Sequence, residues 1–371
     1  MAMRFHAPYM EWAKKRPAAA FDLAGSNVRA CTIDDLEGAR EALSFAGHND
    51  NGYEPLIAAI AARYGVAPAS ITTASGTSGA NFQVYAAFLE PGCDLLVERP
   101  GYDPLVGSGR LLGANVVRFD RRFEEGYALD PDRVARAITP RTRLIVLTTP
   151  HNPTGTVADR AALEEVGRHA RAVGAYVLVD EVYLDAAESE ARPATTLGDA
   201  FITTSSLTKS YGLASLRCGW TISSPEVAER IRRARDVIDG TGSIVAERLS
   251  TLAFEQLPKL ATRAHQLLTA NAAIIKAFLE SRDDLDAVVP RLSTVIFPKL
   301  LGETDTTPFA DRLLSERETA IVPGRFFEAA DHIRVGLGST TDTLRSGLER
   351  LAQALDERRP KRRTKRRQKR R

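Results

Sequence analysis

Short apolar runs alternate with helical segments between residues 94 and 204, and this alternation limits the chain to few folds. Five runs rich in apolar or β-branched residues predict strands: Asp94–Glu98, Asn115–Phe119, Arg143–Thr148, Tyr176–Val179 and Ala200–Thr204. The segments between them predict helices at about Tyr102–Leu112, Pro131–Ala137 and Ala158–Ala172. Apolar strands joined by helices form a mostly parallel sheet with helices on both faces. We therefore expect an α/β protein whose ligands bind beyond the carboxyl ends of the strands.

The chain is long enough for two domains. Its 371 residues exceed what one hydrophobic core usually supports, and its composition changes after a helical region at about Val245–Leu279. Alternating stretches and a last amphipathic helix then predict a smaller α+β domain: Ala287–Val289, Val295–Phe297, Ala320–Val322, His332–Leu337 and Thr341–Leu355. We predict an irregular N-terminal arm with part of the small domain at 1–45, a large domain at 46–270, the small domain at 271–357, and a basic, disordered tail at 358–371.

The positive net charge comes from the end of the chain. The formal charge is +3, and residues 361–371 hold nine Lys and Arg and no acid, so the remainder carries +3 − 9 = −6. Because the tail has no aromatic residue to stack on bases, a solvated tail is favoured over contact with nucleic acid, an anionic membrane surface or an acidic partner. The lack of a long apolar run and of a signal peptide predicts a cytoplasmic protein. The three cysteines and six histidines show no ligand spacing, so we expect no disulfide and no metal.

A small-residue turn lies between a short strand at Ile71–Thr73 and a helix at about Ala80–Leu89. Its residues, Ala74 to Gly79, would leave several backbone N–H groups at the positive end of a helix, which suits a phosphate. A plain turn from strand to helix is the alternative, and the residues alone leave both open.

Lys209 stands in an unusual place for an ammonium group. It follows the last predicted strand among hydroxyl, glycine and apolar residues, and Arg217 follows it in the same stretch. A lysine in low-dielectric surroundings near another positive charge loses proton affinity and becomes a nucleophile toward a carbonyl. The alternative is a lysine at a strand end with its ammonium in water.

Four motifs in this order resemble those of the class I/II pyridoxal-phosphate-dependent aminotransferases of fold type I, the aspartate aminotransferase superfamily. They are Thr149 to Gly155 (TPHNPTG), Asp180 to Tyr183 (DEVY), Ser206 to Trp220 with Lys209 and Arg217, and His332 to Val335 (HIRV). The resemblance spans roughly residues 20–356. It implies pyridoxal 5′-phosphate as the cofactor, a homodimer with a shared active site, and transfer of an amino group between an amino acid and a 2-oxo acid.

The resemblance also implies the catalytic groups. Lys209 would form the Schiff base with the cofactor and then move a proton between the substrate Cα and the cofactor. Asp180 would pair with the pyridine nitrogen and keep it protonated, so that the ring draws electrons. Tyr183 and Asn152 would hydrogen-bond the phenolic oxygen of the ring.

Further residues would hold the cofactor's phosphate and the substrate. The resemblance implies that the phosphate is bound by Arg217, Ser206 and the backbone of Gly76, Thr77 and Ser78, and that Tyr102 stacks on the ring. It also implies that Arg334 binds the substrate's α-carboxylate with Asn152 nearby, and that Gly25 or Asn27 lies beside that carboxylate.

One part of the sequence departs from the family's pattern. The tyrosine that members lend to the neighbouring subunit's phosphate is missing from Phe45–Gly52, so His48, Asn49 or Tyr53 replaces it or the contact is absent. Substrate identity is not predicted. A β-eliminating lyase on the same cofactor is the first alternative. A cofactor-binding regulator that contacts DNA is the second, although the short N-terminal arm leaves no room for the usual DNA-binding domain.

Overall fold

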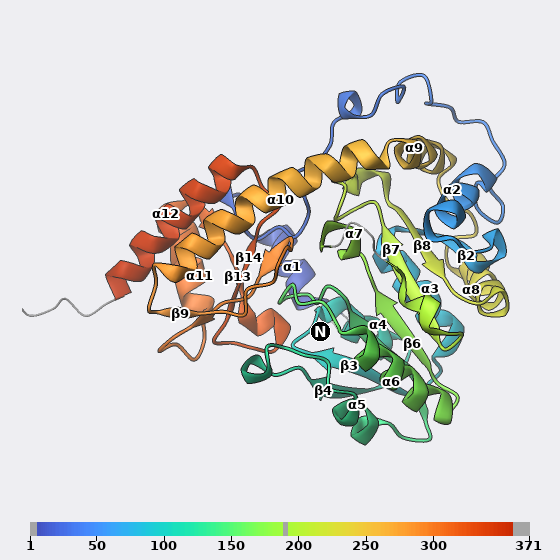
Figure 1. The fold of residues 1–371 in the computed structure, drawn as a ribbon, viewed down its shortest axis with the longest axis horizontal. Coiled ribbons are helices and arrows are strands. Elements are labelled where there is room, and N and C mark those ends of the chain that lie inside the picture. The colour runs from blue at the N-terminus through green and yellow to red at the C-terminus, as the bar shows by residue number, and fades with distance from the viewer. Residues whose placement is uncertain (1–5, 188–191, 359–371) are drawn as a thin grey trace, which may run out of the picture.

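The computed structural model describes residues 6–187 and 192–358, and a seven-stranded sheet lies at its centre (Figure 1). The strand order is β2-β8-β7-β6-β5-β3-β4. All neighbours pair in parallel except β8, which runs antiparallel to both β2 and β7. The strands are β2 (Ile71–Ser75), β3 (Asp94–Arg99), β4 (Asn115–Asp120), β5 (Thr142–Thr148), β6 (Tyr176–Asp180), β7 (Phe201–Ser206) and β8 (Cys218–Ile222). The mostly parallel sheet and its five predicted strands are confirmed, whereas β8 was not predicted.

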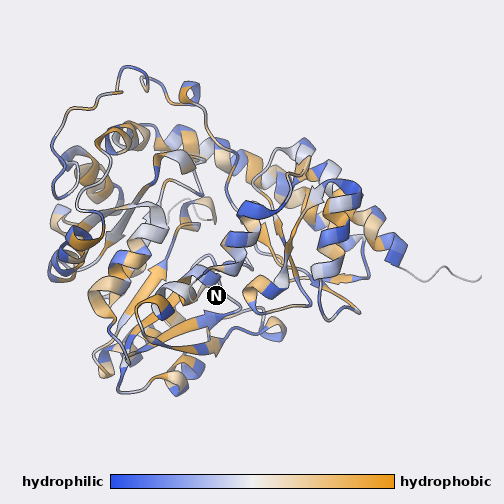
Figure 2. Ribbon diagram, turned by 180° about the vertical axis from the view of Figure 1, so that it is seen from behind, coloured by the Kyte–Doolittle hydropathy of each residue, from blue (hydrophilic) through white to orange (hydrophobic). Residues whose placement is uncertain are grey.

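Helices cover both faces of this sheet. Alternate residues of a strand point to opposite faces, so Leu95 and Val97 pack in one apolar cluster and Leu96 in another. The first cluster contains residues of α3 (Gly76–Phe88), α4 (Asp103–Leu111) and α8 (Pro225–Ile238), and the second contains residues of α5 (Pro131–Ala137) and α6 (Arg160–Ala172). Figure 2 shows the apolar strands enclosed between these helices. The other helices beside the sheet are α2 (Glu54–Tyr64), which ends at Gly65 as a C-cap, and the short α7 (Leu184–Ala187).

Smaller sheets and helices lie beside the large sheet. The predicted helical region at Val245–Leu279 consists of two helices, α9 (Ile244–Glu255) and α10 (Leu257–Glu280). Gln256 lies between them, and Pro258 stands in the first turn of the second, where no N–H is needed. In Figure 1, α10 runs from the large sheet to the smaller ones. The remaining elements are β9 (Leu285–Asp286), β10 (Val295–Ile296), β11 (Lys299–Leu300), α11 (Thr307–Arg317), β12 (Thr319–Ala320), β13 (Val322–Pro323), β14 (Ile333–Gly336) and α12 (Thr341–Arg358). The strand predicted at Ala287–Val289 is wrong, since the strand ends at Asp286. The domain boundaries stay a prediction, and the predicted tail lies outside the described residues beyond Arg358.

The N-terminal segment was predicted to be irregular, but it contains the helix α1 (Pro8–Lys15) and the strand β1 (Phe21–Asp22). Pro8 does not break α1, because it stands at the first helical position, where no N–H is needed. Strand β1 pairs with β12, and the backbone N–H of Val28 then donates to the carbonyl of Lys209 (2.9 Å). The segment therefore joins the smaller sheets to the loop that carries the lysine. Among the described residues, none of the helices has the length and apolar character to cross a membrane.

Candidate active site

A cavity of about 340 Å³ lies beyond the carboxyl ends of β3, β5, β6 and β7. Most of the predicted site residues line it: Gly25, Asn27, Thr77, Ser78, Tyr102, Asn152, Asp180, Tyr183, Ser206, Lys209 and Arg217. Gly76 and Arg334 do not line it. Gly76 contacts a lining residue through a hydrogen bond from its N–H to the carbonyl of Arg217 (2.8 Å), and Arg334 contacts another through a hydrogen bond to Asn152 (3.0 Å). The sequence motifs thus meet in one place, while the role of each residue stays a prediction.

Lys209 follows β7, and protein oxygens hold its amine. Its Nζ donates to Asn27 Oδ1 (2.6 Å) and to Ser26 Oγ (3.0 Å). Burial lowers the pKa of Lys209 to about 8; the charges of Arg334 and Arg217 also lower it, and Asp180 opposes them. About a tenth of this amine is therefore unprotonated at pH 7, far more than for an exposed lysine, and the unprotonated form is the one that attacks an aldehyde.

Asp180 ends β6 and is the buried carboxylate of the cavity. Asn81 Nδ2 donates to its Oδ2 (2.9 Å), and the backbone N–H of Val182 donates to its Oδ1 (3.1 Å). The amide of Asn81 is oriented by Thr204 Oγ1, which donates to its Oδ1 (2.6 Å). Burial raises the pKa of Asp180 to about 6, and these hydrogen bonds and Lys209 limit the rise. The carboxylate is thus fixed in position and ready to pair with a cationic group.

Tyr183 is a neutral hydrogen-bond donor in this cavity. Burial raises the pKa of Tyr183 to about 12, so its phenol stays protonated at neutral pH. Its hydroxyl donates to Ser26 Oγ (3.1 Å), the same oxygen that receives a hydrogen bond from Lys209. Ser26 therefore bridges the amine and the phenol, although the sequence drew attention only to its neighbours Gly25 and Asn27.

The small-residue turn is the first turn of a helix. α3 begins at Gly76 and not at Ala80 as predicted, so the backbone N–H groups of its first turn lack partners within the helix. Thr77 and Ser78 of this turn line the cavity. Thr77 Oγ1 donates to Ser206 Oγ (2.9 Å), which joins the helix start to the end of β7. A positive helix end with several free donors is suited to an anion.

Arg217 and Thr208 complete this end of the cavity. Gly76 has a φ of +69°, which favours glycine, and a Cβ there would come within 2.4 Å of Arg217 Nη2, so a side chain would displace the guanidinium. Within the part of the chain that the structure describes, Arg217 makes only long hydrogen bonds, to the carbonyls of Ala214 (3.4 Å) and Ser75 (3.3 Å). Thr208 Oγ1 is buried and has no hydrogen-bond partner among the described residues. Sequence reasoning missed Thr208, although it stands directly before Lys209.

Arg334 lies on β14 and is fully buried. Its Nη1 donates to Asn152 Oδ1 (3.0 Å), and its Nη2 donates to Tyr9 Oη (2.7 Å) and to the carbonyl of Ala24 (2.9 Å). The rings of Tyr9 and Phe327 lie against the guanidinium, at 5.1 Å and 4.9 Å from its carbon to their centroids. Tyr9 also lines the cavity, and no local motif marked it as a site residue.

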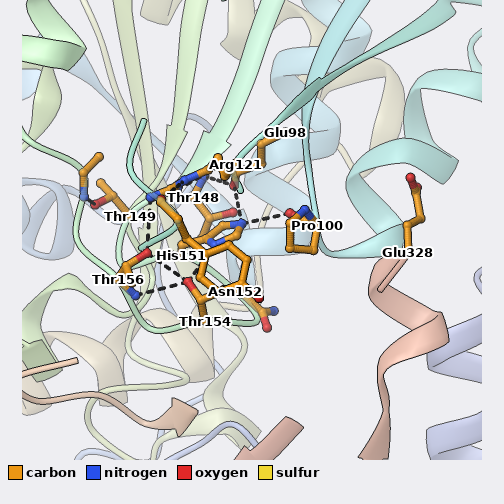
Figure 3. Close-up of polar contacts among 12 residues, drawn as sticks. Glu98, Pro100, Arg121, Thr148, Thr149, His151, Asn152, Thr154, Thr156 and Glu328 are labelled. Carbon is orange, nitrogen blue, oxygen red and sulfur yellow. Dashed lines mark hydrogen bonds and ion pairs between the residues drawn. The ribbon is translucent and has the colours of Figure 1, made fainter. Parts of the chain in front are cut away.

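A buried polar network holds the loop that carries Asn152 (Figure 3). Glu98 accepts hydrogen bonds from Arg121 Nη1 (3.0 Å) and from the N–H of Thr148 (2.6 Å), and the side chains of Glu98 and Arg121 are both fully buried. His151 is within hydrogen-bond distance of Thr154 Oγ1 (2.8 Å) and of the carbonyl of Pro100 (2.9 Å). Burial and Arg121 hold the pKa of His151 well below its usual range, so the imidazole is neutral. The network ties the loop after β5 to the loop after β3, which carries Tyr102.

Comparisons with known proteins agree with this geometry. The family model described as aminotransferase class I and II matches residues 32–351. The chain is 31% identical to a capreomycidine synthase of Streptomyces vinaceus, over 94% of this chain and 93% of that protein. It is 28% identical to an aspartate aminotransferase of Streptomyces avermitilis, over 82% of this chain and 80% of that protein. A PLP-dependent aminotransferase from Streptococcus suis superposes with a TM-score of 0.91 at 27% identity, covering 96% of this chain and all of that one. The chain therefore belongs to the aminotransferase class I and II family, and it is an enzyme whose cofactor is pyridoxal 5′-phosphate.

Proposed function

We propose that this enzyme transfers an amino group between an amino acid and a 2-oxo acid. The observation that carries the proposal is an amine of lowered pKa, Lys209, in the same cavity as the buried carboxylate of Asp180. An amine and a carboxylate of this kind suit the two ends of pyridoxal phosphate that take part in its chemistry, the aldehyde and the pyridine nitrogen.

The residues present fit this cofactor. The start of α3, the loosely bonded guanidinium of Arg217 and the unpartnered hydroxyl of Thr208 offer donors for a phosphate at one end of the cavity. Lys209, Asp180 and Tyr183 offer groups for the ring at the other. We assign the phosphate to Gly76, Thr77, Ser78, Ser206, Thr208 and Arg217, and the ring to Tyr102, Asn152, Asp180, Tyr183 and Lys209.

The bound cofactor supplies an electron-withdrawing ring that stabilises negative charge at the substrate Cα. Asp180 would hold a proton at the pyridine nitrogen, and Asn81 and Val182 keep its carboxylate oriented. Lys209 Nζ, as a free amine, would take the proton from the substrate Cα as a general base and give it back as a general acid. Tyr183 would donate its phenolic proton to the phenolic oxygen of the ring in place of Ser26 Oγ.

The substrate's α-carboxylate is assigned to the region of Arg334 and Asn152, near Gly25 and Asn27. Arg334 supplies a permanent positive charge there, and its bond to Asn152 Oδ1 keeps both groups in place. This assignment defines α-amino acids as the substrate class and leaves the side chain open.

A second candidate function is a reaction on the same cofactor that consumes no oxo acid, such as β-elimination. One reported relative, at 31% identity, is named a synthase and not an aminotransferase. The two candidates are distinguished by whether turnover requires a 2-oxo acid.

We also propose that the enzyme is a homodimer that shares its active sites. Leu43 and Phe45 are exposed apolar residues, with Phe45 95% exposed, and the segment that follows them meets Gly242 through Asn49 Nδ2 (2.9 Å). Exposed aromatic residues of this kind favour a covered surface. Which of His48, Asn49 and Tyr53 replaces the missing tyrosine stays open. The cytoplasmic location and the absence of a metal stay predictions.

The function is tested with the purified enzyme loaded with pyridoxal 5′-phosphate. Amino acids are screened for loss of the absorbance band of the lysine-bound cofactor, and 2-oxo acids for its recovery. A true aminotransferase recovers the band only when an oxo acid is added. Lys209→Ala should bind the cofactor without a covalent bond and lose turnover by about 10²–10⁴-fold or more, because the positioned base is gone; full activity would overturn the assignment.

A further inference from the structure

Tyr9 joins helix α1 to Arg334, and we infer that its hydroxyl is a hydrogen-bond donor to the substrate's α-carboxylate. This inference rests on the proposed function, in which Arg334 provides the charge for that carboxylate. Arg334 is fully buried and does not line the cavity, whereas Tyr9 does. A carboxylate that enters the cavity in this structure therefore meets the tyrosine before the arginine.

Arg334 has too few free N–H groups to bind a carboxylate with two parallel hydrogen bonds. A guanidinium has five N–H groups. Both of those on Nη2 are used, by Tyr9 Oη and the carbonyl of Ala24, and one on Nη1 is used by Asn152 Oδ1. The two that remain, one on Nη1 and the one on Nε, point to opposite edges of the group and do not form the fork that a carboxylate prefers. The Nε atom is buried and has no hydrogen-bond partner among the described residues.

The hydroxyl of Tyr9 can replace the missing half of that fork. It accepts a hydrogen bond from Arg334 Nη2 at 2.7 Å, so its own proton remains available to donate. A hydroxyl that accepts from a cation becomes a stronger donor, because hydrogen bonds in a chain polarise one another. Tyr9, polarised by the buried guanidinium of Arg334, can therefore bind a carboxylate in the cavity while all the existing hydrogen bonds of Arg334 are kept.

Helix α1 holds this hydroxyl in place. The backbone N–H of Tyr9 donates to Asp103 Oδ2 (2.9 Å), at the start of α4. The ring of Tyr9 packs against Tyr102 (5.8 Å between centroids) and Phe327 (5.7 Å). The hydroxyl therefore has a fixed position before any substrate arrives, which reduces the ordering cost of binding.

The test is the affinity for propionate, a carboxylate without an amine, measured on the cofactor-loaded enzyme by absorbance titration at constant ionic strength. Tyr9→Phe keeps the ring and removes only the hydroxyl. We expect it to raise the dissociation constant for propionate by on the order of ten- to a hundredfold. Ethylamine, which has no carboxylate, should bind equally to both proteins. With an amino acid substrate, KM should rise while kcat changes much less.

Three control variants make the result decisive. Tyr85→Phe removes a buried hydroxyl that donates to Leu105 outside the cavity, and should leave propionate binding unchanged. Trp12→Ala loosens α1 without removing the hydroxyl; an equal loss of affinity in this variant would mean that helix docking alone is responsible, and would overturn the inference. If Tyr9→Phe binds propionate as tightly as the wild type, or more tightly, the substrate displaces the hydroxyl and the inference is wrong. If Arg334→Gln also leaves the affinity unchanged, the carboxylate binds elsewhere and the substrate position in the proposed function fails as well.

Discussion

Lys209 and Asp180 shift each other's proton affinity, and this coupling can be measured. The pKa of Lys209 is about 8, so its free amine accumulates as the pH rises from 7 to 9, well below the pH at which an exposed lysine reacts. We expect pyridoxal, trapped by borohydride on the apoenzyme, to label Lys209 with a midpoint near pH 8. At pH 7 the fraction of free amine should be roughly two orders of magnitude above that of a surface lysine.

Asp180→Asn separates the two roles of the carboxylate. Because Asp180 raises the pKa of Lys209, its removal should move the labelling midpoint to lower pH. Turnover should nevertheless fall, since the ring nitrogen loses the carboxylate that keeps it protonated. Mass spectrometry of the Lys209 peptide gives the midpoint, and a midpoint that moves upward would contradict the coupling.

The site residues that sequence reasoning found and those that it missed differ in a physical way. Lys209, Asp180 and Asn152 stand in motifs of neighbouring residues with a recognisable order. Ser26 meets Lys209 and Tyr9 meets Arg334, partners that are 183 and 325 positions away in the chain. A serine in a Gly-Ser-Asn stretch or a tyrosine on a short helix is common, so nothing local in the sequence shows which groups they will meet.

Among the elements, the loops after β3 and β5 depend on one buried ion pair. Glu98→Gln leaves the guanidinium of Arg121 buried without its counter-charge, and loss of one member of such a pair costs about 3–5 kcal/mol. We expect that loss in the free energy of unfolding, measured with urea, together with weaker substrate binding because Asn152 and Tyr102 lose support. Glu98→Leu with Arg121→Met should recover part of the stability.

A surface pair provides the comparison. Glu11→Gln removes the partner of Lys15 on α1, at the protein surface, and should leave the urea midpoint unchanged. Equal destabilisation by the two substitutions would show that the buried network has no special part in stability.

The elements themselves were largely predictable where the apolar pattern was long. Strands β3 to β7 follow from continuous apolar runs, whereas β8 contains Gly219, which reads as a turn residue. In the structure, a Cβ at Gly219 would come within 2.4 Å of the backbone carbon of Gly76, so the glycine permits the start of α3 to lie close to β8. Helix α1 lies in the segment predicted to be irregular, and Pro8 occupies its first helical position.

At the scale of the whole molecule, the proposed homodimer gives a direct prediction. In sedimentation experiments, the molecular mass of the wild-type enzyme should be about twice the 40.4 kDa of the chain. Phe45→Asp replaces an exposed aromatic residue, which a second copy would cover, with a charged one. It should weaken self-association markedly. Leu301→Asp, at a 41% exposed leucine among the smaller sheets, should not. A monomeric wild type would overturn the proposal.

The pairing of Tyr9 with Arg334 also has a consequence for the order of events during synthesis. The ribosome makes Tyr9 early and Arg334 more than three hundred residues later, so the two cannot meet while the nascent chain is short. The large sheet can form as its strands emerge, but its catalytic cleft stays unfinished until the C-terminal strands arrive. A released fragment that lacks β14 would accordingly lack the guanidinium to which the substrate's α-carboxylate is assigned, although it contains Lys209.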